Sequence, residues 1–454
     1  MPTLTTIVTA APQRTRTTSF AGLTPILSPV AAKMKDAFLR LAIPSMPIPM
    51  LSGLVDDHYD NNSSSDESNF DEQPELVTWF LDTRTLWPGD NIFSASGAAD
   101  ALALISAQEQ HIVTTKMFIA DARMSLGSAL LKRLFISKTL GIPWKDVRMA
   151  RKGDPKHGKP CAVDEMGKPI QGIDFNVSHQ NGLVALIGWN GRGAQRHQMS
   201  GGFQGMFSPR VSKLDDVMVG VDIVCVNERE SAASTIDSEG FDGWVDIYDA
   251  VFSDEERWTM KYDVDYLTLL DGTVIPGHDI GRHDRCIMRN KDIALTTQAG
   301  QDLTFNSELL IDAKLRRFYT HFCYKESYIK LAGEALLAPW LKDLEFFNVR
   351  SPQPGTVARC STLGTWGEEV DDVEVRMHGR VVSDVKMKIQ AFEEDFMLST
   401  SIQGNVQGRK IPGFTKMSLE KDILTFANSH LHDFDSGSSS PIDLMSPWES
   451  RYWS

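Results

Sequence analysis

Apolar residues recur along the chain with two spacings, and each spacing predicts one kind of element. Runs rich in β-branched and aromatic residues, or alternating with polar ones, predict strands. The predicted strands are residues 76–82, 182–188 and 217–224, followed by a closing meander over 372–390 and 395–402. Apolar spacings of three and four residues predict helices over 98–108, 116–140, 241–250, 253–261 and 309–333. This mixture of helices and strands predicts an α/β (α+β) fold.

Stretches without either spacing divide the chain into regions. We expect a disordered leader and linker over 1–75, an N-terminal half over 76–216, a C-terminal half over 217–430 and a flexible tail over 431–454. The linker is polar, acidic and turn-rich between residues 56 and 75, so it buries too little apolar surface to fold alone. Turn-forming residues over 190–215 and 262–305 predict insertions. Each half contains a helix, a charged loop and an apolar strand, which permits a pseudo-twofold duplication.

The composition is that of an ordinary globular protein, but its charge argues against two classes of partner. The 454 residues are 42% hydrophobic and 23% charged, and 46 Lys and Arg stand against 60 Asp and Glu, for a net charge of −14. A general binder of nucleic acid or of anionic membranes needs a broad basic face, which this balance does not supply. A local basic pocket is compatible with it. Every apolar run is shorter than the roughly 18–20 residues that span a bilayer.

Two features bear on the cellular compartment. The five cysteines are scattered and show no zinc-ligand spacing, which favours a reducing compartment, so we expect a cytoplasmic protein. The first acidic residue is Asp36, and the preceding segment is rich in threonine and contains Arg14 and Arg16. Such a start is also typical of a mitochondrial transit peptide. The leader is therefore either a transit peptide or a segment without fixed structure.

The helix predicted over 309–333 carries a carboxylate on its apolar face. Its apolar stripe steps by three, four and seven residues through Leu315, Phe318, Phe322 and Ile329. Glu326 falls on the same stripe, and Lys330 lies one turn further along. A buried carboxylate is costly unless it is paired or binds a cation, so Glu326 is a candidate functional residue. The alternative is a surface Glu–Lys pair four residues apart, worth roughly a few tenths of a kcal/mol.

A second carboxylate interrupts an apolar strand. Asp222 lies within 217–224, whose other residues are apolar except for Gly220. A carboxylate at the end of a strand suits a hard cation, which prefers oxygen ligands. An aspartate that ends the strand or caps a helix is the alternative.

Two polar segments offer contacts to an anion. Asn176, Ser178 and His179 fall in the string Asn-Val-Ser-His, where Ser and Asn provide neutral hydrogen bonds and a protonated His can hold an anion. An ordinary Asn or Ser turn with an exposed histidine is the alternative for this string. A basic loop with Arg151 at one end and Lys159 at the other is either a solvated turn or a partner for phosphate, which Arg and Lys bind well.

The order of these groups along the chain resembles that of the 4′-phosphopantetheinyl transferase superfamily. The family signature is Gly-Ile/Val-Asp, followed at a distance by Trp/Phe-x-x-Lys-Glu-Ser/Ala-x-x-Lys. Here Gly220-Val221-Asp222 matches the first part and the nine residues from Phe322 to Lys330 match the second. The strings 140–148 and 158–160 are similar to eukaryotic members. The resemblance spans residues 115–345 with interruptions. More narrowly, the chain resembles the pseudo-dimeric class of the family, in a eukaryotic, fungal and cytosolic form.

The resemblance implies an activity, a fold and a set of partners. The enzyme would move 4′-phosphopantetheine from coenzyme A to a serine of an acyl or peptidyl carrier domain and release adenosine 3′,5′-bisphosphate. The fold would be two similar α/β halves arranged as a pseudo-dimer, with the active site between them. Carriers of this kind belong to aminoadipate reductase, polyketide synthases and nonribosomal peptide synthetases. We further expect a monomer that binds neither nucleic acid nor a membrane.

The resemblance also implies roles for individual residues. Asp222 and Glu326 match the carboxylates that bind Mg²⁺. Glu326 would also activate the carrier serine, directly or through a metal-bound water, and Lys330 would bind coenzyme A and stabilise or protonate the departing phosphate. The residues that match the loop gripping the phosphates and adenine of coenzyme A are Arg151, Lys156, Gly158 and Lys159. Those that match a second phosphate-binding turn are Asn176, Ser178 and His179. Lys325 belongs to the motif but points about 100° away from Glu326 on a helix, so it is a weaker candidate for the site.

Some details depart from the family pattern. Val224 stands where some members carry a further acidic ligand, and a water can complete the coordination of Mg²⁺ there. An arginine that helps to bind coenzyme A in relatives has no clear counterpart near Ile112, although Lys116 or Arg123 could substitute. The earlier string Gly172-Ile173-Asp174 also matches the first part of the signature, but Asp222 has the expected order.

Two other functions fit parts of the sequence. An inactive carrier-binding protein of the same fold would keep the overall pattern, but the intact Asp222, Glu326 and Lys330 argue against it. Another Mg²⁺-dependent enzyme acting on a phosphoanhydride, such as a nucleotide hydrolase, is a third candidate. The glycine-rich phosphate loop of that class is missing from the sequence.

Overall fold

The computed structural model describes most of the chain between Glu75 and Leu431. The described residues are 75–153, 158–192, 217–226, 230–269, 271–280, 289–334, 338–355, 363–405 and 408–431. The predicted leader up to residue 74, most of the predicted insertion at 190–215, the predicted tail from residue 432 and the candidate residue Lys156 lie outside this part. Among the described helices, none combines the length and the apolar character that a membrane crossing requires.

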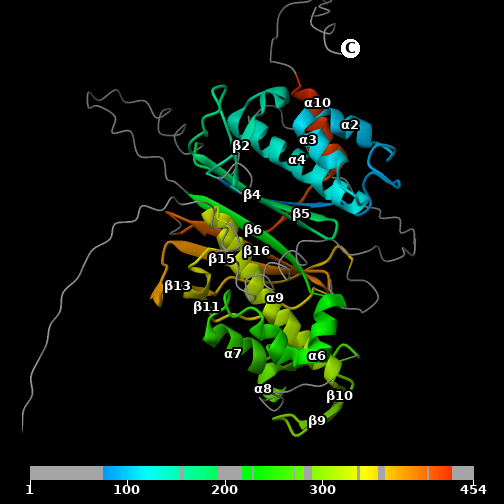
Figure 1. Ribbon diagram of the computed structural model, residues 1–454, viewed down its shortest axis with the longest axis vertical. Helices are drawn as coiled ribbons and strands as arrows, with labels where there is room; N and C mark the ends of the chain where they lie inside the picture. Colours follow the sequence, from blue (N-terminus) through cyan, green and yellow to red (C-terminus); the bar gives the residue numbers. More distant parts are fainter. Residues whose placement is uncertain are drawn as a thin grey trace, which may run out of the picture. The chain divides into compact units, whose positions relative to one another are not determined.

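Two four-stranded sheets organise the structure (Figure 1). The first has the order β17 (Thr415–Lys416), β1 (Leu76–Asp82), β5 (Leu183–Asn190) and β4 (Ile173–Gln180). The second has the order β12 (Trp366–Val370), β15 (Val385–Phe392), β16 (Phe396–Gln403) and β6 (Met218–Cys225). All neighbours are antiparallel except β1 and β17, which are parallel. The strands predicted at 76–82, 182–188 and 217–224 are therefore confirmed.

Each sheet is covered by one long helix. α4 (Ile119–Leu140) packs on β4 and β5, and its apolar residues form a core with the first sheet. α9 (Ser307–Ala332) packs on β6 and β16 of the second sheet. Both helices end at a glycine in the left-handed region, Gly141 and Gly333, which stops the helix where the sequence places it. The long helices predicted at 116–140 and 309–333 are confirmed, and the described part of the chain is a mixed α+β structure.

Shorter elements complete the described chain, and two of them correct predictions. The remaining elements are α2 (Ala98–Ala103), α3 (Ala107–Thr114), η1 (Trp144–Asp146), β2 (Met149–Arg151), β3 (Pro160–Ala162), α6 (Glu230–Asp246), α7 (Asp254–Tyr262), β7 (Tyr266–Thr268), β8 (Val274–Pro276), α8 (Gly277–Ile280), β9 (Asp292–Thr296), β10 (Asp302–Asn306), η2 (Leu341–Asp343), β11 (Leu344–Phe347), β13 (Glu374–Met377) and β14 (Arg380–Val381). The helix predicted over 98–108 is two helices, because Ser106 caps α3 in a reciprocal pair with Glu109. The alternation over 372–390 is split between two sheets, because β13 pairs with β11 and only β15 joins the meander.

The end of the described chain crosses back to the first sheet. After β16, the chain adds β17 beside β1 and continues into the π-helix η3 (Leu419–Leu424) and α10 (Thr425–Ser429), drawn in red beside α4 in Figure 1. Ile423 and Ala427 are fully buried in the core that contains α4. The predicted division into halves at residues 216 and 217 stays a prediction, but residues 415–431 pack with the first sheet rather than the second.

Candidate active site

The site forms where the edge strands of the two sheets meet. β4 is the last strand of the first sheet and β6 is the last strand of the second, and side chains of β4 bond to the backbone of β6. Three acceptors on β4 meet three amides of β6: Asp174 with Val219 at 3.0 Å, Asn176 with Val221 at 3.1 Å, and Ser178 with Ile223 at 3.3 Å. Every second residue takes part on both strands, because alternate residues share one face or one edge. The two strands are thus joined by side chains that satisfy the open edge of β6.

This arrangement corrects the prediction for Asn176, Ser178 and His179. They lie within the strand β4, not in a turn. The strand was missed because its alternate buried positions are polar, and those side chains face β6 instead of an apolar core. The side-chain oxygen Oδ1 of Asn176 and the Ser178 hydroxyl both accept hydrogen bonds from β6. Contacts of these two residues with a phosphate stay predictions.

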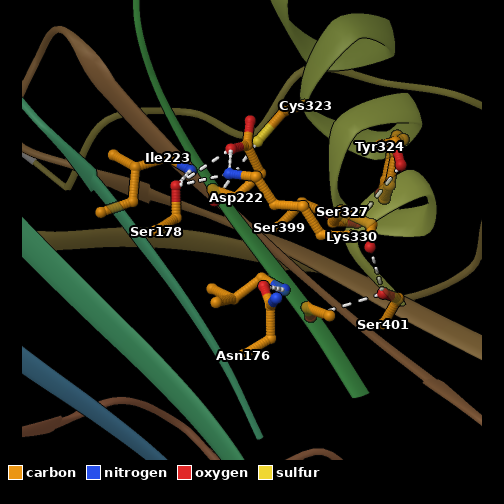
Figure 2. Close-up of polar contacts among 12 residues, drawn as sticks. Asn176, Ser178, Asp222, Ile223, Cys323, Tyr324, Ser327, Lys330, Ser399 and Ser401 are labelled. Atoms are coloured by element: carbon orange, nitrogen blue, oxygen red, sulfur yellow. Dashed lines mark hydrogen bonds and ion pairs between the residues drawn. The ribbon is translucent and has the colours of Figure 1, made fainter. Parts of the chain in front are cut away.

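Asp222, Ser178 and Lys330 form a closed triangle of hydrogen bonds (Figure 2). The Lys330 ammonium lies 2.5 Å from Oδ1 of Asp222 and 2.9 Å from Oγ of Ser178, and that hydroxyl lies 3.0 Å from the same Oδ1. The Asp222 side chain is 7% exposed and that of Lys330 is 29% exposed. The structure therefore brings together β4, β6 and α9 at one point, as the candidate roles of Asp222 and Lys330 require.

Gly220 explains how the helix comes so close to the strand. A Cβ at this position would lie 2.1 Å from the Ser327 carbonyl oxygen and 2.7 Å from the Leu331 amide nitrogen, both on α9. Any larger residue would push α9 away from β6. Ser401 of β16 also donates to the Ser327 carbonyl, at 2.9 Å (Figure 2). The glycine two residues before Asp222 is thus the condition for placing that carboxylate beside the helix.

Glu326 is buried without a hydrogen-bond donor from the described residues. It is 8% exposed, and its burial together with the negative charge of Asp222 raises its pKa to about 8, against the opposing effect of Lys330. Burial also raises the pKa of Asp222, although Lys330 and Ser178 oppose that shift. Burial alone would lower the pKa of Lys330, but the two carboxylates raise it above its usual value. Two buried carboxylates with one ammonium are short of positive charge.

The donor set is suited to a cation that keeps much of its own hydration. Asp222 and Glu326 supply carboxylate oxygens, and within the described ranges no cluster of three or more His, Cys, Asp or Glu could hold a metal. Val224, at the position where the family pattern allows a third acidic ligand, is a buried apolar residue. Mg²⁺ is commonly bound by one or two carboxylates together with waters and substrate phosphates, so the two oxygen donors fit it.

Only some of the predicted coenzyme A ligands are free to meet an anion. Arg151 is exposed, and one guanidinium nitrogen donates to the Gly158 carbonyl at 2.8 Å, so its other donors can face a ligand. His179 is also exposed, yet desolvation by surrounding atoms and the charges of three lysines lower its pKa to about 4. These lysines are Lys330, Lys116 and Lys132. The imidazole is therefore neutral near pH 7, where it would bind a phosphate as a neutral donor.

Lys159 has different surroundings from those that the resemblance implied. Its side chain is 4% exposed, and its ammonium contacts the Asp174 carboxylate and the Val219 carbonyl, the latter at 2.7 Å. This geometry does not support a contact between Lys159 and a phosphate. Asp174, which the sequence offered only as a false match to the signature, is the residue that holds this lysine.

Sequence reasoning also underestimated Lys325. Its ammonium is buried, lies 3.0 Å from the Glu256 carboxylate, and donates to the carbonyls of Leu341 and Leu344. Glu256 caps α7 and accepts from the amides of Ser253 and Phe346. The prediction that Lys325 points away from Glu326 agrees with these contacts. Nothing in the sequence pattern linked it to Glu256, which lies 69 positions earlier.

Comparisons with known proteins agree on one family. A family model described as "4'-phosphopantetheinyl transferase, N-terminal" matches residues 94–190. The chain is 60% identical over 353 residues to a 4′-phosphopantetheinyl transferase of Aureobasidium melanogenum, covering 78% of this chain and 98% of that protein. It is 33% identical to 4′-phosphopantetheinyl transferase A of Aspergillus fumigatus, over 73% and 84% of the two chains. It is 29% identical to 4′-phosphopantetheinyl transferase NpgA of Emericella nidulans, over 79% and 96%.

Proposed function

Because the chain belongs to the 4′-phosphopantetheinyl transferase family, we propose that it moves the 4′-phosphopantetheine group of coenzyme A to the acceptor serine of acyl or peptidyl carrier domains. It is a transferase, and carrier domains are its acceptors. The products would be the modified carrier and adenosine 3′,5′-bisphosphate. The observation that carries the proposal is the cluster of Asp222, Glu326 and Lys330 at the meeting of β6 and α9.

The chemistry divides between the two carboxylates and the ammonium. The carrier serine oxygen attacks the phosphorus next to pantetheine, the bond between that phosphorus and the bridging oxygen breaks, and the departing phosphate keeps the electron pair. Glu326 takes the serine proton, directly or through a water, because its carboxylate is buried at the site without a donor from the described residues. Lys330 stabilises the negative charge on the departing phosphate, because its ammonium stays charged at neutral pH.

Asp222 and Glu326 would hold the Mg²⁺ ion. When bound, the ion supplies positive charge that neutralises the pyrophosphate as its bond breaks. Lys330 and Ser178 already hold the Asp222 carboxylate in one orientation, so the ligand geometry is set before a metal arrives. The Glu326 carboxylate, which meets no donor among the described residues, would provide the second ligand through its oxygen lone pairs.

The coenzyme A site would lie beside the basic loop and the exposed end of β4. Arg151 and Gly158 of the basic loop and His179 of β4 are the proposed ligands, together with Asn176, Ser178 and Lys156 from the family pattern. Lys116 and Lys132 join them, because both lie close enough to His179 to lower its pKa. The sequence suggested Lys116 or Arg123 as a substitute for a missing arginine. The charge of Lys116 near His179 favours Lys116, while Arg123 donates to the carbonyl of Trp87.

The two sheets would be the cores of two similar halves in a pseudo-dimer. Each sheet has four strands and one long helix, and the edge strands β4 and β6 meet at the candidate site. A single chain would then contain both halves of the site, so the enzyme would act as a monomer.

Intact-mass spectrometry of a carrier domain tests the proposal. An unmodified carrier incubated with this protein, coenzyme A and Mg²⁺ should gain the mass of one phosphopantetheinyl group, and the gain should disappear with EDTA and return with added Mg²⁺. Asp222→Ala should abolish the gain and keep the fold, as judged by circular dichroism. Coenzyme A binding without any gain across several unrelated carriers would instead indicate an inactive carrier-binding protein.

A further inference from the structure

Lys159 lies at the junction of three elements that carry the candidate site. It directly precedes β3, and its backbone carbonyl accepts from the Lys152 amide at 2.8 Å. Its ammonium contacts the carboxylate of Asp174 on β4, the carbonyl of Val219 on β6 at 2.7 Å, and the carbonyl of Leu331 near the end of α9 at 3.5 Å. A lysine ammonium has three donors, so these acceptors use them all.

The surroundings of Lys159 are built for this side chain. Gly333 ends α9 at a φ of 73°, and a Cβ at that position would lie 3.4 Å from the Cβ of Lys159. The lysine stem therefore packs against the end of the helix. A cation at this place is also favoured by the partial negative charge of the helix C-terminus. Burial lowers the pKa of Lys159, and the Asp174 carboxylate opposes that shift.

Asp174 ties the same junction to the ladder between the strands. Its Oδ2 accepts from both Lys159 and the Val219 amide, so it forms the first of the three links between β4 and β6. Asp222 lies three residues further along β6, and Glu326 and Lys330 lie on the last two turns of α9. A shift at this junction would therefore change the distance from Asp222 to both residues of the helix.

We propose that Lys159 and Asp174 are positioning residues, forming a buried clamp that fixes β6 and the end of α9 against β4 and so sets the geometry of Asp222, Glu326 and Lys330. This inference rests on the proposed function for its effect on transfer, but the clamp itself is a property of the unliganded protein. It gives Lys159 a role through other residues in place of a contact with coenzyme A.

The test compares two lysines that share one carboxylate. Lys159→Met removes the clamp, and Lys152→Met is the matched control. Lys152 contacts Asp174 Oδ1 at 3.1 Å, but its side chain is 45% exposed and has no contact with β6 or α9 among the described residues. Three quantities are measured for each full-length variant well below its unfolding temperature: kcat for transfer, the calorimetric Kd for coenzyme A, and amide hydrogen exchange of β6 and α9.

The expected result for Lys159→Met is a split between turnover and binding. The kcat should fall by about tenfold or more, because small displacements of catalytic groups are costly, and the Kd for coenzyme A should change by less than about threefold. The amides of Val219 and of the last turn of α9 should exchange faster. Lys152→Met should leave kcat and the amide exchange of β6 and α9 within about twofold of the wild type. Its Kd for coenzyme A does not decide the test, because Lys152 lies in the basic loop.

Two results would overturn the inference. A large rise in the Kd with unchanged kcat would make Lys159 a coenzyme A ligand. A lower Tm with unchanged kcat and unchanged exchange of the Val219 amide would make it an ordinary stabilising residue. If Lys159→Met does not fold, Asp174→Asn replaces it, with the same expected split and the same overturning results. A wild-type enzyme without transfer would contradict the proposed function alone, since the exchange experiment needs no substrate.

Discussion

The two sides of α9 contain similar buried charged residues. On one side every carboxylate has hydrogen-bond donors, and on the other side one carboxylate has none among the described residues. On one side, Lys325 and Glu256 are buried, and Glu256 accepts from Lys325 and from two backbone amides. On the other side, Lys330 pairs with Asp222, while Glu326 meets no donor among the described residues. Each side pairs a lysine with a buried carboxylate. Lys325 of the first side and Glu326 of the second are adjacent in sequence. We refer to the first as the closed side and to the second as the open side.

The difference shows how one helix separates stability from chemistry. Burial raises the pKa of both Glu256 and Glu326, but on the closed side the charge is balanced by fixed donors. A balanced buried pair holds elements together and has no capacity left for a ligand. An unbalanced buried carboxylate is instead a site for a cation or a proton. Motif residues that differ by one position can therefore have unrelated roles.

The largest expected effect comes from replacing one glutamate on each side with glutamine. Glu326→Gln should lower kcat by at least about 10³-fold, because it removes the base and one metal ligand, while the Tm stays level because Gln keeps the shape of the buried side chain. Glu256→Gln should do the reverse, with kcat retained and the free energy of unfolding lowered by about 2 kcal/mol. Transfer rates and thermal unfolding of both variants measure this crossover. Near-native turnover of Glu326→Gln would contradict the assigned mechanism.

The closed side makes a second prediction about coupling. Lys325→Met should lower the free energy of unfolding by about 3–5 kcal/mol, because it leaves the Glu256 carboxylate buried and unpaired. The double variant Lys325→Met/Glu256→Gln should recover part of this loss. Urea unfolding of the single and double variants gives the coupling energy. Additive losses would show that the two side chains act independently and would remove the basis for the comparison.

A smaller effect is expected for a coenzyme A ligand on the open side. His179→Ala should weaken coenzyme A binding by about tenfold with little change in kcat. A bound phosphate favours the protonated imidazole, whose pKa without ligand is about 4. The difference in affinity between wild type and variant should therefore widen as the pH falls from about 7 to about 5. Calorimetry at several pH values measures it, and a gap that is constant with pH would assign His179 a neutral contact only.

The smallest predicted effect belongs to a residue that no motif identified. Lys132 lies near Glu109, Arg133 and Arg151 and contributes to the low pKa of His179. Lys132→Met should weaken coenzyme A binding by about threefold, and the loss should shrink at high salt, because the contribution is a screened charge. Lys138→Met, on the last turn of the same helix beside Phe426, is the control and should bind as the wild type does.

Periodicity predicted the elements whose polar and apolar residues lie on opposite faces. The strand at 76–82 and the helices at 116–140 and 309–333 follow this rule. β4 does not, because Asp174, Asn176 and Ser178 point to the edge of another sheet, a partner that a local pattern cannot reveal.

The candidate site was predictable where a residue broke a local rule. Glu326 stood out as a carboxylate on an apolar stripe, and Asp222 as a charge in an apolar strand. Lys159 and Lys325 broke no rule, because a lysine in a loop or on a helix is ordinary. Their partners Asp174 and Glu256 are 15 and 69 positions away, so only the folded chain shows that these lysines are buried.

The return of residues 415–431 to the first sheet determines when this sheet can finish folding during synthesis. β17 is hydrogen-bonded to β1, and Ile423 and Ala427 complete the core beneath α4. A ribosome releases β1 and α4 hundreds of residues before these partners emerge. During that interval the apolar face of α4 lacks part of its cover. The first sheet therefore finishes folding only after the second has been synthesised, and a fragment ending at residue 216 would display this apolar surface to solvent and to chaperones.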